Sequence, residues 1–226
     1  MKKILFIYPE TYLNIGIPGG IAIMSALLKQ RNHKVDLFDT AFLKTEDYAK
    51  TEEVHGGVGL SDKGGVCMHK KTEYTLQDLV LDDPVVDLKE ELQKKIDSFN
   101  PDIIALSCMT SNFDFACDLT KTIKHNAIVV VGGVHATIAY QDCLDQECID
   151  YAFVGEADRG MIDFVEALEK NEDPNKVPGL AYKKDNGEYV NNRVGPRVCL
   201  DDLPCPDWGL FDERHLFRPF EGKIYK

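Results

Sequence analysis

Five short apolar runs, separated by segments with helical periodicity, constrain the fold of this 226-residue chain more than any other feature. The apolar runs occupy residues 3–9, 34–40, 102–110, 127–133 and 150–156, and the predicted helices occupy residues 19–32, 85–100, 113–126, 140–147 and 158–171. Continuous apolar strands that alternate with helices are typical of a parallel sheet whose two faces are both covered. We therefore predict an α/β fold, a Rossmann-like (flavodoxin-like) sheet of five parallel strands with helices on both faces.

Two segments interrupt this pattern. Residues 41–86 are glycine-rich in part and show no sustained period, which predicts an irregular insertion. Residues 179–192 alternate around Asn186-Gly187, a strong signal for a β-hairpin.

The chain after the hairpin differs from what precedes it. Residues 199–212 are acidic and broken by prolines, which is typical of a linker. The predicted organisation is therefore a first domain at residues 1–172, followed at residues 173–226 by the hairpin and a linker that leads elsewhere.

Composition excludes several classes of function. A net charge of −12 argues against a nucleic-acid-binding surface. No apolar run approaches the roughly 18 residues of a membrane span, and the run after the first three residues is too short for a signal peptide. Seven cysteines without C-x-x-C spacing indicate reduced thiols in a cytoplasmic protein. Cys143 with Cys148, or Cys199 with Cys205, could form a metal pair, although cysteines of this kind more often pack as small apolar residues.

The predicted sheet places a ligand beyond the carboxyl ends of its strands, where the strand order reverses. A dinucleotide fingerprint is not matched, because Gly16, Gly19 and Gly20 stand at the wrong spacing, although Asp39 ends the second strand. The chain also lacks a P-loop, the acidic residues of a phosphorylation receiver and a G-x-S-x-G turn.

Small residues remain at the predicted strand ends, and they bear hydroxyls or expose backbone. They are Ser107, Thr110, Ser111, Gly132, Gly133, Thr137 and Gly155. Such a set can line a slot for a flat or extended ligand held by hydrogen bonds. Each residue also has a purely structural explanation, a serine bonded to nearby backbone or a glycine turn, but their coincidence at adjacent strand ends favours a ligand site.

The order of several short motifs resembles the N-terminal cobalamin-binding region of cobalamin-dependent radical S-adenosylmethionine enzymes. The motifs are KILFIYP, IPGGIAIMSALLKQRNHKVDLFD, PDIIALSCMT, VVVGGVHAT, DYAFVGEAD, VPGLAYKKDNGEYV and LDDLPCPDWGLFD, and they cover nearly all of the chain outside residues 41–86. The resemblance implies a domain that buries the nucleotide tail of cobalamin between the first and third strands.

The resemblance also implies a set of contacts. Ser107 and Thr110 would bond the tail, Gly132-Gly133 would pack against the dimethylbenzimidazole, and the corrin ring would lie across the strand ends, near residues 10–17 and His135 or Thr137. The full set of cofactor-binding residues is Glu10, Thr11, Asn14, Ile15, Gly16, Ile17, Ser107, Thr110, Ser111, Gly132, Gly133, His135, Thr137, Gly155 and Glu156. On this basis we expect Gly133→Val to block the slot and to leave the fold intact.

Cobalt is expected to have no protein histidine as its lower ligand. Cobalamin-dependent mutases and methionine synthase carry D-x-H-x-x-G after the first strand, where this chain reads YPETYLNIGIPGG. The resemblance thus implies base-off cobalamin without a histidine below the cobalt. His135 would instead bond a corrin amide or a backbone carbonyl, whereas His55 and His69, within the insertion, could cover the upper face of the ring.

The catalytic machinery of the radical enzymes is expected outside this chain. Their iron–sulfur cluster is held by a C-x-x-x-C-x-x-C triplet, which the seven cysteines do not form. We expect a module that binds cobalamin but does not catalyse alone, and a parent with S-adenosylmethionine and a [4Fe-4S] cluster that is a methyltransferase or a cyclase. The alternatives are a domain that binds NAD or a sugar nucleotide, and a stand-alone cobalamin carrier or sensor that lacks the radical domain.

Overall fold

The computed structural model describes residues 1–12, 16–46, 84–195, 198–216, 218–220 and 223–225. Most of the predicted insertion therefore lies outside the described residues, as do His55, His69, Asn14 and Ile15. At the two ends of the insertion, Lys44 and Val85 form an isolated parallel bridge, so the chain leaves and re-enters the sheet region at neighbouring points.

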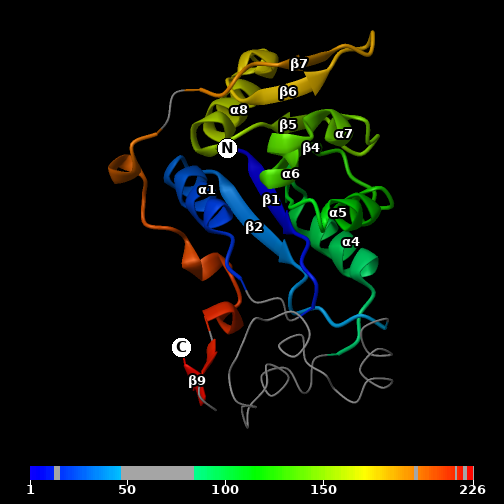
Figure 1. Cartoon of the computed structure of the whole chain (residues 1–226), viewed down its shortest axis with the longest axis vertical. Coiled ribbons are helices and arrows are strands. Elements are labelled where there is room, and N and C mark those ends of the chain that lie inside the picture. Colours follow the sequence, from blue (N-terminus) through cyan, green and yellow to red (C-terminus); the bar gives the residue numbers. More distant parts are fainter. Residues whose placement is uncertain (13–15, 47–83, 196–197, 217, 221–222, 226) are drawn as a thin grey trace.

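One sheet of seven strands organises the molecule (Figure 1). Its order is β2-β1-β3-β4-β5-β6-β7, with strands at Lys3–Tyr8 (β1), Lys34–Asp39 (β2), Ile103–Ser107 (β3), Ile128–Gly132 (β4), Tyr151–Phe153 (β5), Leu180–Lys183 (β6) and Tyr189–Asn191 (β7). The first five strands are parallel, which confirms the predicted fold class. The predicted hairpin is β6 and β7, and it extends the sheet because β6 pairs antiparallel with β5.

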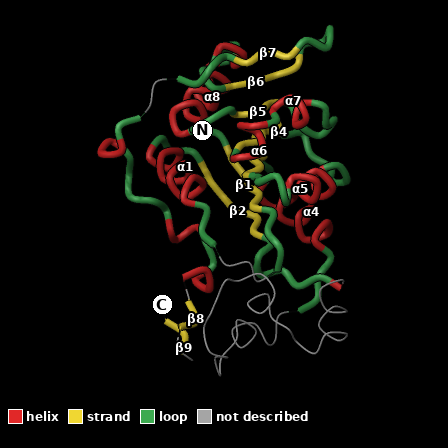
Figure 2. Tube along the Cα trace, in the orientation of Figure 1, coloured by secondary structure: helices red, strands yellow, loops and turns green. Residues whose placement is uncertain are grey.

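Helices cover both faces of this sheet, as Figure 2 shows. The helices are Gly19–Gln30 (α1), Leu88–Phe99 (α4), Phe113–Thr120 (α5), Val134–Ile138 (α6), Tyr140–Leu144 (α7) and Asp158–Lys170 (α8). Short 3-10 turns span Pro174–Lys176 (η2), Leu200–Asp202 (η3), Trp208–Leu210 (η4) and Glu213–Leu216 (η5), and two further strands, Arg218–Phe220 (β8) and Lys223–Tyr225 (β9), pair with each other.

Alternate strand residues feed two separate cores, as the period of two in a strand requires. Leu5, Ile7, Ile104, Leu106, Val129 and Val131 pack with α4, α5 and α7. Ile4, Phe6, Ile103, Ala105 and Val130 pack with α1 and α8. These buried strand residues explain why the apolar runs are continuous rather than alternating, since neither face of the parallel region meets water.

Among the helices that are shorter than the sequence pattern predicts, α4 and α5 show a local cause. α4 begins at Leu88 rather than residue 85, because the Asp87 carboxylate accepts from the amides of Lys89 and Glu90, at 2.8 and 3.2 Å, and so caps the helix. α5 ends at Thr120, whose hydroxyl bonds back to the carbonyl oxygens of Ala116 and Cys117. Such back-bonding weakens a helix.

The segment after β4 also differs from the prediction. The sequence predicts one short helix at residues 140–147, whereas the structure has α6 at Val134–Ile138 followed by α7 at Tyr140–Leu144. The residues directly after Gly132-Gly133 are therefore a helical turn rather than an open loop.

Residues 207–216, here called the strap, pack back onto the first domain. The Asp207 carboxylate accepts from Ser25 Oγ at 2.6 Å and pairs with Lys29, both on α1. Phe211 belongs to the core under α1 and α8, and His215 bonds Asp39 at the end of β2. The strap lies within the predicted linker, and it contacts α1 and the end of β2.

None of the helices in the described part of the chain is long and apolar enough to cross a lipid bilayer.

Candidate functional site

The strand order reverses between β1 and β3. β1 pairs with β2 on one side and with β3 on the other, and the chain runs from β2 back across to β3. In an open parallel sheet, this arrangement opens a crevice beyond the carboxyl ends of the two central strands. The segments that follow β1, β3, β4 and β5 meet at this edge, which is where those predicted site residues that the structure describes lie.

Three residues form a row at the carboxyl ends of the central strands. Ser107 pairs in register with Gly132, and Tyr8 is next to Ser107 because Ile7 pairs with Leu106. The alternation of the strands directs the Ser107 side chain to the face that α1 and α8 cover. Within the described residues, the half-buried Ser107 hydroxyl makes no hydrogen bond to protein.

Glycines leave room beside this row. A Cβ on Gly132 would meet nothing nearer than Phe153 Cβ, at 4.0 Å, and a Cβ on Gly19 or Gly20 would meet nothing within 4 Å. Gly19 and Gly20 open α1, whose first intrahelical bond is the one from the Ala22 amide to the Pro18 carbonyl. The strand ends therefore combine a hydroxyl that makes no protein hydrogen bond within the described residues with a glycine position that has room for a Cβ.

Gly133 has a different role from Gly132. Its φ is +99°, and a Cβ there would lie 2.5 Å from the carbonyl oxygen of Cys108 and 3.1 Å from its nitrogen. The loop after β3 thus occupies the space that a side chain would need, and Gly133 is a requirement of the protein's own packing. The expectation that Gly133→Val leaves the fold intact is wrong, since both the conformation and the contact oppose any side chain.

Thr137 joins the ends of β4 and β5. Its hydroxyl donates to the Gly133 carbonyl at 3.0 Å and accepts from the Gly155 amide at 3.0 Å. Gly155 has a φ of +85°, a conformation that glycine adopts without strain. Thr137 is exposed, so its methyl group is available to a ligand although its hydroxyl is used within the protein.

His135 is buried between the ends of β3 and β4. Its ring lies 4.1 Å from that of Phe113, centroid to centroid, and its Nδ1 is 3.3 Å from the hydroxyl of Thr110. Nε2 is buried and has no hydrogen-bond partner among the described residues. The imidazole therefore anchors the loop after β3 through Thr110, while Thr110 and Ser111 themselves are exposed.

A buried polar pair links the two sides of the crevice. Glu10, which follows β1, accepts from Asn112 Nδ2 at 3.0 Å, and Asn112 Oδ1 accepts from the Met109 amide at 2.8 Å. Burial raises the pKa of the Tyr8 phenol, and Glu10 and then Asp39 raise it further, so this hydroxyl stays protonated. The sequence nominates Glu10 for direct ligand contact, whereas the buried carboxylate bonds the loop after β3.

The other nominated residues lie around this crevice. Thr11 and Glu156 are exposed, and Ile17 packs against the core under α1. Gly16 is half-buried, with its Cβ position 3.9 Å from the Tyr8 hydroxyl. Asn112 and Tyr8 are part of the site but were not among the predicted ligand-binding residues. Neither carries a sequence signal, because an asparagine before a helix and a tyrosine that ends a strand are common.

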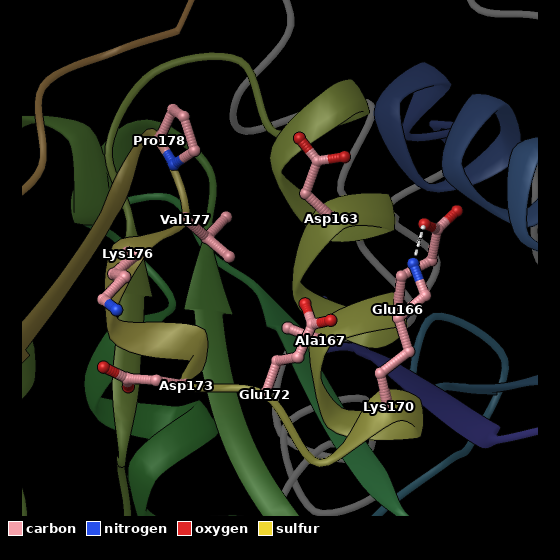
Figure 3. A pocket seen from close by; sticks show the side chains of 9 residues that line it. All are labelled: Asp163, Glu166, Ala167, Lys170, Glu172, Asp173, Lys176, Val177 and Pro178. Carbon is pink, nitrogen blue, oxygen red and sulfur yellow. Dashed lines mark hydrogen bonds and ion pairs between the residues drawn. The ribbon is translucent and has the colours of Figure 1, made fainter.

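A surface depression elsewhere, between α8 and η2, has a volume of about 530 Å³. Figure 3 shows the side chains that line it. Acidic and basic side chains line it, and Lys170 pairs with Glu166 at 3.2 Å within it. This mixed charge is typical of a solvated surface and contrasts with the uncovered backbone at the strand ends.

Residues 68–165 of the chain match the family model described as the B12 binding domain. The matched range includes Ser107, Gly132 and Gly155, and therefore the ends of β3, β4 and β5. Ser107 and Gly132 of the row lie within the matched range, whereas Tyr8 lies outside it.

Proteins with similar sequence or fold are larger. The anaerobic magnesium-protoporphyrin IX monomethyl ester cyclase of Cereibacter sphaeroides is 30% identical over 143 residues, which is 60% of this chain and 23% of the cyclase. Among solved structures, the cobalamin-dependent S-adenosylmethionine radical enzyme OxsB with aqua-cobalamin and S-adenosylmethionine bound has a TM-score of 0.59 and 16% identity, over 92% of this chain and 24% of that enzyme.

The radical S-adenosylmethionine methyltransferase TsrM from Kitasatospora setae, with cobalamin and a [4Fe-4S] cluster bound, also has a TM-score of 0.59, at 13% identity over 91% of this chain and 31% of that enzyme. At these identities the solved structures share the fold with the chain, and the chain spans under a third of each of the three proteins.

Proposed function

We propose that the chain holds cobalamin at the carboxyl ends of β1, β3 and β4, because residues 68–165 match the B12 binding domain model in agreement with the resemblance. The nucleotide tail enters beside the row of Tyr8, Ser107 and Gly132, on the face that α1 and α8 cover. The corrin ring lies across the loops that follow these strands.

The observation that supports this placement best is the Ser107 hydroxyl beside the backbone of Gly132. Ser107 has no hydrogen-bond partner within the described chain, and the Cβ position of Gly132 is open to 4.0 Å. A buried or half-buried hydroxyl without a partner costs free energy unless water or a ligand bonds it. A tail with hydroxyl and phosphodiester oxygens provides such partners, and a flat base fits against bare glycine backbone.

Different residues of the chain would contact different parts of the cofactor. Ser107 bonds the tail, Gly132 admits it, and Thr110, Ser111 and Thr137 stand exposed at the rim where the corrin amides would lie. When bound, cobalamin supplies a cobalt centre that can carry a methyl group. We assign no protein histidine to the lower face of cobalt, and His135 is buried against Phe113.

We infer further that the chain acts as the N-terminal module of a radical S-adenosylmethionine enzyme, a methyltransferase or a cyclase, whose cluster and S-adenosylmethionine bind in another domain. The cyclase and the methyltransferase reported above support this inference. The reduced cysteines expected from the sequence support a cytoplasmic location.

An absorbance titration with hydroxocobalamin tests the binding function. We expect a saturable spectral change of the base-off type, with cobalamin retained on the protein after desalting. His135→Gln should leave the spectrum unchanged, because this histidine does not bind cobalt. If the purified chain gave no spectral change and retained no cobalamin, the proposed function would be rejected, and NAD or a sugar nucleotide would be tested in its place.

The Ser107→Ala variant tests the placement of the tail. Loss of one hydrogen bond should weaken hydroxocobalamin binding roughly 3- to 10-fold without changing the urea midpoint. Ser98→Ala is the matched control, since Ser98 lies exposed on α4 and bonds only the Lys95 carbonyl. Equal affinity of the Ser107 and Ser98 variants would place the tail elsewhere.

A further inference from the structure

The row at the carboxyl ends of the strands continues onto β2. Tyr8 pairs in register with Asp39, the last residue of β2. Leu37, two residues earlier, packs in the core under α1 and α8, so the alternation of the strand directs Asp39 to that same face. Asp39 therefore lies on the face where the nucleotide tail is proposed to enter, at its β2 side.

The strap reaches this carboxylate with an imidazole. Because a carboxylate can only accept, His215 Nε2 donates to Asp39 Oδ2, while Asp39 Oδ1 accepts from the Ala41 amide at 2.9 Å. The His215 side chain is fully buried, and the Asp39 side chain is 13% exposed. The strap and the loop after β2 thus hold the same carboxylate from two sides.

Aromatic packing surrounds this bond. The ring of His215 lies 4.7 Å from that of Phe42, centroid to centroid and at 70°, and 6.0 Å from that of Phe211. The Arg214 guanidinium lies over the outer ring, 4.2 Å from the centroid of Phe42. Phe42 belongs to the loop after β2, so the end of the strap is packed against this loop. A carboxylate in such a place costs free energy if its donor is lost.

Hydrogen bonds continue from Asp39 to the crevice. The next residue, Thr40, is buried; its amide donates to the Tyr8 carbonyl oxygen at 3.2 Å, and its hydroxyl donates to the Glu10 carbonyl oxygen. The Glu10 carboxylate accepts from Asn112, as described above. A continuous set of bonds therefore connects the strap with the segments after β1 and β3, which form the two sides of the crevice.

We propose that His215 is a positioning residue for the cofactor site: by bonding Asp39 it fixes the loop after β2 and, through Thr40, the segment after β1, in the arrangement that accepts the cobalamin tail. This inference rests on the proposed function, since its ligand is the cofactor proposed above. Docking of the strap and binding of cobalamin then favour each other. Such a coupling is reciprocal, so bound cobalamin holds the strap in place as much as the strap assists binding.

Two substitutions of His215 separate its hydrogen bond from its packing. His215→Leu fills the space between the aromatic rings but cannot donate to Asp39, whereas His215→Gln keeps a donor. In hydroxocobalamin titrations of the full chain, we expect His215→Leu to bind about 5- to 20-fold more weakly and His215→Gln to bind within about 2-fold of the wild type. His125→Leu is the matched control: this half-buried histidine precedes β4, at the opposite end of the sheet, and should not change the affinity.

Tryptic cleavage after Arg214, followed by mass spectrometry, measures the docking of the strap. Without cobalamin, we expect cleavage about 5-fold or more faster in His215→Leu than in His215→Gln, because cleavage follows the population of the released strap. Saturating hydroxocobalamin should slow cleavage of the wild type by a factor similar to the affinity that His215→Leu loses. Thr40→Val, which breaks the connection beyond the strap, should lower the affinity and leave cleavage of the cobalamin-free chain unchanged.

The outcomes separate this inference from the proposed function. Wild-type affinity in folded His215→Leu, or no protection of Arg214 by bound cobalamin, would overturn the inference and leave the proposed function intact. The protection measurement uses the unaltered chain, so it decides the matter even where a variant does not fold. A wild-type chain that binds no hydroxocobalamin would reject the proposed function and the role of His215 together.

Discussion

Gly132 and Gly133 are neighbours in sequence with opposite environments. The position of a Cβ on Gly132 is open, while the Cβ position of Gly133 is filled by the Cys108 backbone at 2.5 Å. Either glycine could have been the one that a ligand approaches, and the sequence offers no means to choose. The choice depends on the path of the loop after β3, which is distant in sequence.

The two alanine variants should therefore behave differently. Gly133→Ala should lower the free energy of unfolding by about 2 kcal/mol or more, because a positive φ and a backbone contact both oppose the methyl group. Gly132→Ala, the matched control, should change it by less than about 1 kcal/mol. Urea denaturation of both variants measures the difference, and equal stability would contradict the assigned roles.

At the scale of elements, the loops after β1 and β3 are joined by one buried pair, Glu10 with Asn112. Asn112 occupies the residue before α5, where an asparagine usually caps the helix, yet its side chain makes no cap and turns to Met109 and Glu10. The strands, both faces of the sheet and the hairpin follow from periodicity and turn residues. The Glu10–Asn112 pair could not be predicted in this way. An asparagine before a helix is usually a helix cap, and nothing in the sequence indicates that Asn112 instead bonds Met109 and Glu10.

Asn112→Ala should destabilise the protein by about 2 to 3 kcal/mol, because the buried Glu10 carboxylate loses a donor and the Met109 amide loses its acceptor. The variant should also bind hydroxocobalamin more weakly, since the loop that follows Ser107 loses an anchor. Urea denaturation and the absorbance titration measure the two effects. The control is Asn126→Ala at an exposed position, which should change neither.

At the scale of the molecule, the strap along α1 makes the C-terminal segment part of the domain surface. Composition predicts a linker here, because prolines and acidic residues are typical of one. That Asp207, Phe211 and His215 contact the domain is evident only from their partners, which lie far away in the sequence. Although burial raises the pKa of the Asp207 carboxyl, hydrogen bonds from Lys29 and Ser25 outweigh it, so the pKa lies below its ordinary value.

This lowered pKa predicts a pH dependence. A carboxylate whose pKa is lower in the folded state stabilises the protein above its unfolded pKa, near 3.9, and the stabilisation disappears as the pH falls through the folded value. Asp207→Asn should cost about 1 kcal/mol at neutral pH, and the difference from the wild type should shrink in strong acid. Urea midpoints between pH 7 and pH 3 measure this, with Asp185→Asn in the exposed hairpin as the control substitution.

The bond between His215 and Asp39 ties the strap to the carboxyl end of β2, the end of the sheet where the crevice lies (Figure 1). A segment attached beyond residue 216 therefore starts its path beside the proposed cofactor site and not at the far edge of the sheet. Encounter between such a segment and the site would be intramolecular over a short tether, so its effective concentration would be high and little chain entropy would be lost on contact.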